Sequence, residues 1–271
     1  MTAEIQKKPG LETLRAAISR LEGHTRRKRA TLPFGVPDID QKLPDGGLTL
    51  GALHEVAGGG NYALNAAAAA RFAAGIAART KGQVLWIVTA ADLFAPALQQ
   101  AGLPASRVLF VEPGSDRDVL ACFEEGLRHP GLGAVVAEVG RLTMTASRRL
   151  QLAAENGGGI GLALRRWRRQ TDAADFGQPT ASTTRWRVSL LPSAPLPVPG
   201  VGDSRWLLEL IRTRSGESAD FEVEARHGQS KLRVAGASER PATGTPDHLD
   251  LAASVGHRPV PPRAGRRRAS A

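Results

Sequence analysis

The stretch EVAGGGNYALNAAAA, which begins at Glu55, has the composition of a phosphate-binding loop, because glycines follow a short apolar run and precede an alanine-rich segment. Such a loop curls backbone N–H groups around phosphates, meets the β- and γ-phosphates with a lysine, and holds Mg²⁺ with a Ser or Thr hydroxyl. With Gly58 as the first glycine of G-x-x-x-x-G-K-[ST], Ala63 replaces the second glycine, Leu64 the lysine and Asn65 the hydroxyl. The pattern predicts a vestigial phosphate loop made of Gly58, Gly59, Gly60, Asn61, Ala63, Leu64 and Asn65.

These replacements weaken the predicted site. The missing lysine removes a charge-assisted contact of about 1.5–3 kcal/mol. The missing hydroxyl removes more, and each ~1.4 kcal/mol is about tenfold in affinity. We therefore expect no cofactor and no catalytic residue, with at most weak ATP or anion binding at the helix N-terminus. The six histidines are scattered, and no Cys, His or carboxylate spacing suggests a metal site.

One carboxylate lies where a second strand of a nucleotide site would end. The run AVVAEV from Ala134 places Glu138 at the end of a predicted central strand, which is where ligands bind in α/β proteins. Glu138 would there help to hold a metal. The alternative is a solvated strand-end residue, and the missing lysine favours this alternative.

Apolar runs that alternate with helical segments define the elements that position these residues. Besides a strand over 53–57, runs begin at Val84, Val108, Ala134 and Ile160. This alternation is typical of a parallel sheet with helices on its faces. Beyond the fifth run, three further runs have no helices between them, which predicts an antiparallel extension at one edge: RWRVSLL from Arg185, RWLLELIRT from Arg205 and FEVEAR from Phe221.

The helix after the glycine loop is predicted to press a narrow apolar ridge on the sheet. Its residues Leu64, Ala68, Phe72 and Ile76 recur at i, i+4 spacing. Earlier in the chain, Pro37 is expected to open a short helix, with a glycine turn at 46–47 after it.

The chain divides into three predicted parts. Residues 1–31 combine an amphipathic helix with a basic linker, RRKR from Arg26. The helix either docks on the core, which is favoured, or serves as an arm for binding a partner or for self-association. Residues 32–235 form the α/β domain. Residues 236–271 are rich in Pro, Ala and Arg without periodicity, and are expected to be disordered.

Charge and composition limit the classes of partner that the chain can have. The 271 residues suffice for one well-buried domain with extensions. A net charge of +10 indicates an anionic partner, with nucleic acid the leading candidate, although arginine enrichment also follows from high-GC coding. The single cysteine, Cys122, and the polar N-terminus indicate a cytoplasmic protein. Arg71 interrupts the longest apolar stretch, so no membrane span is predicted.

The segment RRWRRQTDAADFGQPTASTT, from Arg165 to Thr184, packs four arginines around Trp167. Arginines can bind phosphates while an indole stacks on an unstacked base, as single-stranded DNA binding requires. The alternative is a solvated loop with its tryptophan docked on the sheet. Two further arginines flank a second tryptophan nearby, so the DNA-binding candidates are Arg165, Arg166, Trp167, Arg168, Arg169, Arg185 and Arg187.

The lead-in PFGVPDIDQKLPDGGLTLGALHEVAG resembles the segment that precedes the phosphate loop in RecA-like proteins, and among them in the ImuA (inducible mutagenesis protein A) group. The resemblance covers roughly residues 32–226. It implies a RecA-like α/β fold: a mostly parallel central sheet flanked by helices, with antiparallel edge strands. It also places the segment from Arg165 at the second DNA-binding loop of that family.

Departures from the family agree with the degenerate loop. The family's catalytic glutamate would fall at Ala91, and its nucleotide-sensing glutamine near Leu164 and Arg165. Neither is retained. The first DNA-binding loop of the family, after the Glu138 strand, is shortened here.

The resemblance implies a non-catalytic accessory of SOS-induced mutagenesis and translesion DNA synthesis. Its implied partners are a Y-family-like adaptor (ImuB), an error-prone replicative-type DNA polymerase, RecA filaments and single-stranded DNA, and it would join the nucleoid on DNA damage. Two alternatives stay open. One is a divergent DNA-dependent ATPase that recruits Lys81 or Lys42; the other is a regulator of cell division similar to SulA.

Overall fold

The structure, a computed structural model, describes residues 30–60, 63–167, 170–193, 200, 202–213, 218–225 and 232–234. All of them belong to one compact unit, Met1–Ala237. The predicted N-terminal helix and C-terminal tail lie outside the described residues, as do the candidate site residues Asn61, Arg168 and Arg169.

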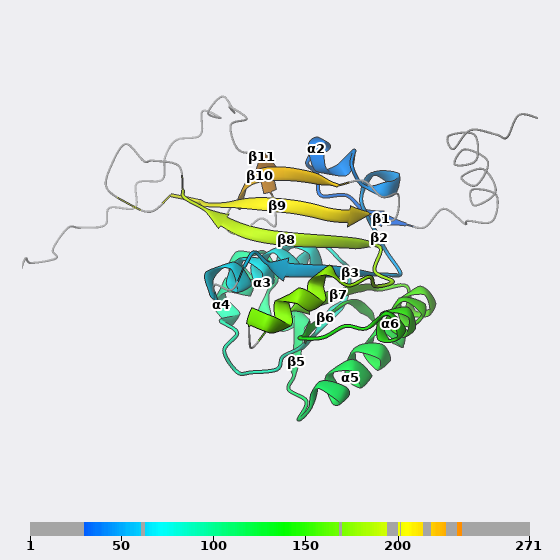
Figure 1. Cartoon of the computed structure of the whole chain (residues 1–271). Helices are drawn as coiled ribbons and strands as arrows, with labels where there is room; N and C mark the ends of the chain where they lie inside the picture. The colour runs from blue at the N-terminus through cyan, green and yellow to red at the C-terminus, as the bar shows by residue number, and fades with distance from the viewer. Residues whose placement is uncertain are drawn as a thin grey trace, which may run out of the picture. The chain divides into compact units, whose positions relative to one another are not determined.

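A nine-stranded sheet forms the centre of this unit (Figure 1). Its strands are β3 (Ala52–Gly58), β4 (Gln83–Ile87), β5 (Val108–Val111), β6 (Leu132–Val139), β7 (Ile160–Arg165), β8 (Thr184–Leu191), β9 (Ser204–Thr213), β10 (Ala219–Ala225) and β11 (Leu232–Val234). Their order is β11-β10-β9-β8-β3-β7-β6-β4-β5. The strands from β8 to β5 are parallel, whereas β9, β10 and β11 are antiparallel to their neighbours.

The predicted mixed sheet is therefore present, with one correction. The run from Arg185 was predicted to belong to the antiparallel extension; β8 pairs antiparallel with β9, but on its other side it pairs in parallel with β3. The segment 166–183, which contains the 3₁₀ helix η3 (Gln170–Gly177), returns the chain from the end of β7 to the start of β8. It acts as the crossover that a parallel pair needs, in place of an α-helix.

Helices cover both faces of the sheet. On one face, α3 (Ala63–Ala78) and α4 (Ala95–Gln100) pack over a core that includes Val56, Trp86 and Trp186. On the other face, α5 (Asp116–Arg128) and α6 (Met144–Gly157) cover a second core around Leu53 and Phe123. The side chains of Ser115 and Thr143 cap the first turns of α5 and α6. Among the described residues, no helix combines the length and hydropathy of a membrane span.

The ridge predicted on α3 is mostly confirmed, since Ala68, Phe72 and Ile76 are buried. The prediction was wrong for Leu64, which is 69% exposed because the first turn of α3 lies at the end of β3, where the sheet stops. Phe72 stacks on Phe34 with ring centroids 5.8 Å apart, which fastens the lead-in segment to this face.

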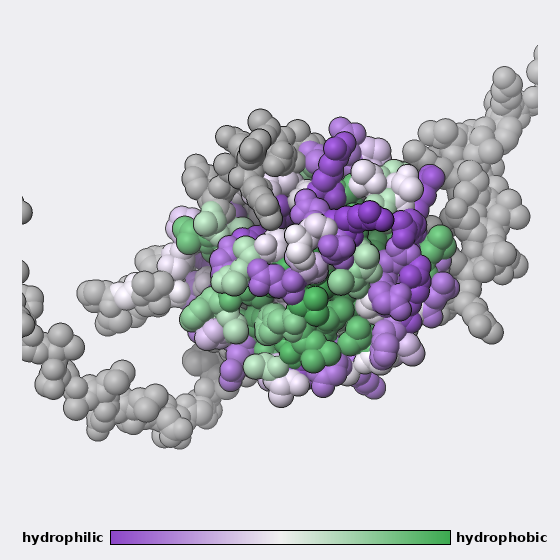
Figure 2. Space-filling view, turned by 90° about the horizontal axis from the view of Figure 1, so that it is seen from below, coloured by the Kyte–Doolittle hydropathy of each residue, from purple (hydrophilic) through white to green (hydrophobic). Residues whose placement is uncertain are grey.

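The lead-in forms a small two-stranded sheet, β1 (Thr31–Leu32) with β2 (Leu48–Thr49). Between them lie α2 (Pro37–Asp40), which opens at proline as predicted, and the 3₁₀ helix η1 (Pro44–Gly46). A second 3₁₀ helix, η2 (Ala105–Arg107), leads into β5. At the lower edge of the sheet in Figure 1, β5 presents apolar residues to the surface. Figure 2 views the molecule from that side and shows an apolar area ringed by hydrophilic residues.

Candidate functional site at the carboxyl edge of the sheet

The glycine loop at the end of β3 is closely packed from two sides. A Cβ on Gly58 would lie 2.8 Å from the backbone nitrogen of Ala66 in α3, and one on Gly59 would lie 1.9 Å from the hydroxyl of Ser189 in β8. The N–H of Gly59 donates to the carbonyl of Val188 at 2.7 Å. The glycines at 58 and 59 therefore have a packing role that does not depend on phosphate.

Asn65, at the position of the magnesium-binding hydroxyl, closes the loop instead. Its Nδ2 donates to the carbonyl of Gly59, and its Oδ1 accepts from the N–H of Leu190 at 2.9 Å. Both ends of the amide thus tie the first turn of α3 to the glycine loop and to β8. Leu64, at the lysine position, points into solvent and has no group that can bind phosphate.

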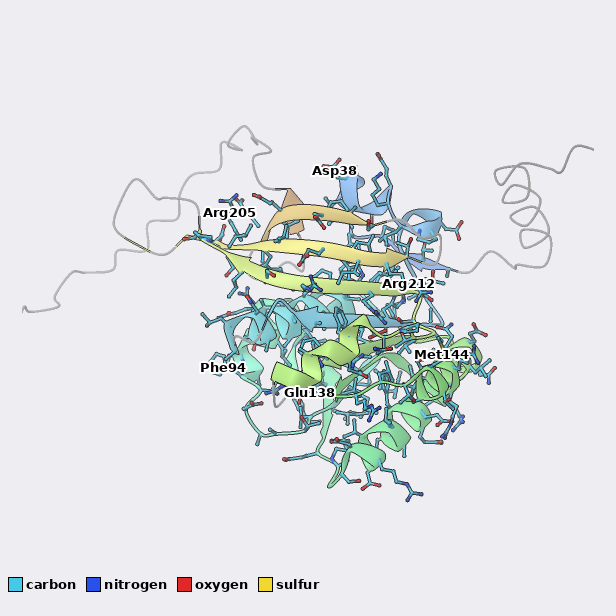
Figure 3. All side chains as sticks on the ribbon, viewed as in Figure 1. Asp38, Phe94, Glu138, Met144, Arg205 and Arg212 are labelled. Carbon is cyan, nitrogen blue, oxygen red and sulfur yellow. The ribbon has the colours of Figure 1, made fainter. Side chains whose placement is uncertain are left out.

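Glu138, at the end of β6, lies within the body of the protein and is 1% exposed (Figure 3). Its carboxylate accepts from the N–H and the hydroxyl of Thr89, both at 2.9 Å, and from Nη1 of Arg166 at 3.0 Å. The alternative of a solvated strand-end residue is therefore wrong. Glu138 is a buried carboxylate that is paired with Arg166. Its hydrogen bonds to Thr89 and Arg166 would have to break before it could bind a metal.

Arg166 joins Glu138 to Asp92 on the loop after β4. Its Nη1 lies 2.7 Å from Oδ1 of Asp92. Hydrogen bonding to Asp92, together with the charge of Glu138, raises the pKa of Arg166 against the effect of partial burial. The hydrogen bond from Arg166 in turn lowers the pKa of Asp92. Arg166 and Asp92 therefore stay ionised at neutral pH, and the contacts of Arg166 connect the ends of β4, β6 and β7.

A second network of charges is buried on the opposite face of the sheet, around Glu55 in β3. Nη1 of Arg165 lies 2.8 Å from one oxygen of Glu55, and Nη2 of Arg185 lies 3.2 Å from the other. The hydroxyls of Thr180 and Ser182 also donate to Glu55. Two arginines, one from β7 and one from β8, thus share a carboxylate that water does not reach.

The same arginines hold the crossover segment against the sheet. Arg165 also pairs with Asp175, and Arg185 donates to the carbonyls of Phe176 and Gln178 at 2.6 and 2.8 Å. The ring of Phe176 lies 5.9 Å from the Arg165 guanidinium and 5.1 Å from that of Arg185. The sequence placed Arg165 in a DNA-binding loop, but it is the last residue of β7 and buried, as is Arg185. Neither guanidinium is presented to a phosphate.

Of the cavities at this edge of the sheet, two are lined by candidate DNA-binding residues. The larger, about 990 Å³, lies where β4, β6 and β7 end and is lined by residues that include Thr89, Asp92, Arg141, Thr143 and Arg166. The smaller, about 340 Å³, lies over the glycine loop, with Trp167, Phe176, Arg187 and Glu209 in its lining. Cationic, acidic and aromatic groups therefore line the region where ligands bind in α/β folds.

Comparisons with known proteins identify the family. No protein-family model matches the chain. Over 251 residues it is 38% identical to Protein ImuA of Caulobacter vibrioides, strain NA1000 / CB15N, and equally to that of strain ATCC 19089 / CIP 103742 / CB 15. Each match covers 88% of this chain and 99% of the relative. The chain belongs to the ImuA family.

A solved structure supports the fold. The crystal structure of the RadB recombinase superposes with a TM-score of 0.50 at 16% identity, over 74% of this chain and 98% of that chain. At this identity the likeness concerns the fold alone. The RecA-like fold and the ImuA family that the lead-in predicted are both confirmed.

In this member of the ImuA family, the remaining candidates for DNA binding differ in their access to solvent. Trp167 packs edge-on against Phe176 of the crossover segment, with ring centroids 5.6 Å apart. Its indole N–H is buried without a partner among the described residues. Arg187 pairs with Glu209 at 3.1 Å and keeps a side chain that is 41% exposed. The role of these residues in DNA binding stays a prediction.

Neither lysine of the ATPase alternative lies near the loop. Lys81 precedes β4, at the amino edge of the parallel strands, and Lys42 follows Asp40, whose charge acts on Arg79 at the end of α3. The glycine loop lies at the other end of α3, whose 16 residues span about 24 Å. That separation exceeds the length of a lysine side chain.

Three residues of the carboxyl edge were missed by the sequence interpretation: Thr89, Asp92 and Arg141. Arg141 is 83% exposed and faces Asp175 at 3.9 Å. All three closely follow predicted strands, which is the signal that could have found them, because the carboxyl ends of parallel strands meet at one edge.

Proposed function

We propose that this member of the ImuA family is a non-catalytic accessory of SOS-induced mutagenesis. In this role it scaffolds translesion synthesis together with a Y-family-like adaptor (ImuB) and an error-prone replicative-type DNA polymerase. Membership of the family supports a role in mutagenesis after DNA damage. The RecA-like fold supplies a rigid body on which binding surfaces can be carried while nucleotide chemistry is lost.

The geometry of Asn65 carries the non-catalytic part of this proposal. A working loop needs a free hydroxyl and a lysine directed at the phosphates. Here the amide of Asn65 is engaged at both ends, Leu64 offers no charge, and Glu138 is neutralised by Arg166. Nucleotide hydrolysis would require three separate groups to be replaced or released.

We further propose that the carboxyl edge contacts single-stranded DNA or RecA-coated strands. Arg141 and Arg187 offer guanidinium groups there that are partly or largely exposed. The chain carries a net charge of +10, which favours association with a polyanion.

Ultraviolet-induced mutation frequency tests this function. We expect it to collapse in a strain that lacks the gene and to be restored by the wild-type chain. A Leu64→Glu chain should restore it equally. Because Leu64 is 69% exposed, the substitution leaves packing intact, yet it puts a negative charge where a phosphate would bind.

The outcomes separate the two parts of the proposal. Unchanged mutation frequency in the deletion strain would reject the role in mutagenesis. A folded Leu64→Glu chain that fails to complement would instead show that nucleotide binding matters, and would contradict the non-catalytic role. ATP turnover by the purified wild-type chain with single-stranded DNA would contradict it as well.

A further inference from the structure

The edge strand β5 (Val108–Val111) exposes apolar side chains on both of its faces. Leu109 is 53% exposed, Phe110 46% and Val111 36%. Among the described residues β5 pairs with β4 alone, so its other side is open. Natural edge strands are normally blocked by charges, prolines or bulges, because an open apolar edge recruits another strand. No residue of β5 supplies such protection, which indicates that the edge is covered in the assembled protein.

The backbone of β5 is oriented so that the N–H and C=O of Phe110 can bind a further strand on the side away from β4. The N–H of Val88, after β4, donates to the carbonyl of Val111 at 2.9 Å, so the polar backbone groups of Val111 face β4. These groups alternate in direction along a strand. Those of Leu109 therefore also face β4, whereas the N–H and C=O of Phe110 face away from the sheet.

We propose that β5 binds β5 of a second copy of this chain, antiparallel and centred on Phe110, so that the two nine-stranded sheets become continuous. In an antiparallel ladder, residues of a hydrogen-bonded pair exchange both N–H···O bonds. The outward groups of Phe110 meet this requirement when the residue faces its own counterpart. An interface related by twofold symmetry uses the same patch on both copies.

This register also buries every exposed apolar side chain of the strand against an apolar partner. Phe110 lies opposite Phe110 of the second copy on the α4 face. On the α5 face, each Leu109 lies opposite Val111 of the other copy. The apolar area of Figure 2 thus faces the same area of the second copy.

Charges at the two ends of β5 select the antiparallel direction and a protein occupant. Arg107, just before the strand, donates to the carbonyls of Ala78, Thr80 and Gly82, and no carboxylate among the described residues pairs with it. Glu112 follows the strand and is exposed. Antiparallel pairing brings each Glu112 end beside the Arg107 end of the other copy, whereas parallel pairing sets like charges together. A nucleic acid is a poor occupant, because it would face an apolar strand and the negative charge of Glu112.

Sedimentation of the full-length chain over a concentration series tests the proposal. We expect wild-type protein to form dimers that dissociate on dilution. Phe110→Asp, which sets two carboxylates opposite each other at the centre, should raise the dissociation constant at least ~30-fold. The matched control is Leu152→Asp on α6, which changes a side chain that is 59% exposed and should leave the dimer intact. Circular dichroism checks that each variant is folded.

Disulfide cross-linking tests the register without a destabilising charge. In a chain whose single cysteine is removed by Cys122→Ser, we expect Phe110→Cys to form covalent dimers on oxidation. The centred register puts the two copies of residue 110 about 5.5 Å apart at Cα, within the range of a disulfide. Leu109→Cys, whose counterparts are not opposite each other, should cross-link much more slowly.

Three results would overturn the proposal. The first is a wild-type chain that stays monomeric at every concentration, which would leave β5 to a different protein. The second is a dimer that persists in folded Phe110→Asp, with no preference for cross-linking at residue 110. The third is open-ended assembly beyond the dimer, because that requires a head-to-tail contact rather than a twofold one.

Discussion

At the scale of single residues, buried polar side chains hold the strands together through hydrogen bonds. His54 in β3 is fully buried, with Nδ1 2.8 Å from the hydroxyl of Thr184 and Nε2 2.9 Å from the carbonyl of Thr49. The indole N–H of Trp186 donates to the same hydroxyl at 2.9 Å. Thr184 therefore donates its own hydrogen to Nδ1, and the ring is neutral with its proton on Nε2.

This histidine should make stability depend on pH. Burial lowers the pKa of His54 from 6.5 to about 4. Between these values the unfolded chain binds a proton that the folded chain does not, so stability falls as the pH drops from 6.5 toward 4. We expect His54→Gln to remove about 2–3 kcal/mol of the loss in unfolding free energy between pH 7 and 4.5, measured with urea. His129→Gln, at an exposed position, is the control and should keep the wild-type profile.

Asn65 offers a second prediction at this scale. Asn65→Ala leaves the carbonyl of Gly59 and the N–H of Leu190 without their partner, and should lower the unfolding free energy by about 1–3 kcal/mol. Leu64→Ala, at the exposed neighbouring position, should change it by no more than about 0.5 kcal/mol. Equal effects of the two substitutions in urea denaturation would show that the amide does not close the loop.

At the scale of elements, the alternation of strands and helices was predictable from local pattern, but the conformation of the crossover segment was not. The strands from β3 to β7 follow apolar runs, and α3 follows the helical spacing of its apolar residues. Arg165 has no such local signal, because its partner Glu55 lies 110 positions away. In the sequence, Arg165 stands in an arginine-rich stretch, which suggests a solvated loop. Only the folded structure shows that Glu55, Asp175 and Arg185 surround it.

The buried pair gives a prediction for this element. Removing one partner of a buried ion pair leaves the other charge uncompensated, at a cost of about 3–5 kcal/mol. Arg165→Met should therefore destabilise the chain by this amount and expose the segment 166–183 to chymotrypsin. Arg187→Met breaks the partly exposed pair with Glu209 and should cost about 1 kcal/mol or less. Similar unfolding free energies and cleavage rates for the two variants would contradict the role assigned to Arg165.

At the scale of the whole molecule, the lead-in motif together with the order of the strands predicted the RecA-like fold and the ImuA family, whereas composition could not locate a binding surface. Two of the predicted DNA-binding arginines, Arg165 and Arg185, form buried ion pairs with Glu55. A third, Arg166, forms ion pairs with Glu138 and Asp92. Net charge counts all of them alike. What remains for a polyanion at the described carboxyl edge are guanidinium groups such as those of Arg141 and Arg187.

Salt dependence distinguishes a DNA-binding edge from a generally basic protein. Each phosphate contact to single-stranded DNA adds about 0.7 to the slope of log affinity against log salt. Arg141→Ala and Arg187→Ala together should therefore weaken binding of a single-stranded oligonucleotide and flatten the slope by about 1.4 if each makes one contact. Arg128→Ala, at the other end of the parallel strands, removes one positive charge from α5, as each of the two substitutions does at the carboxyl edge, and should leave the slope unchanged. A slope that falls equally in both proteins would assign DNA affinity to overall charge rather than to this edge.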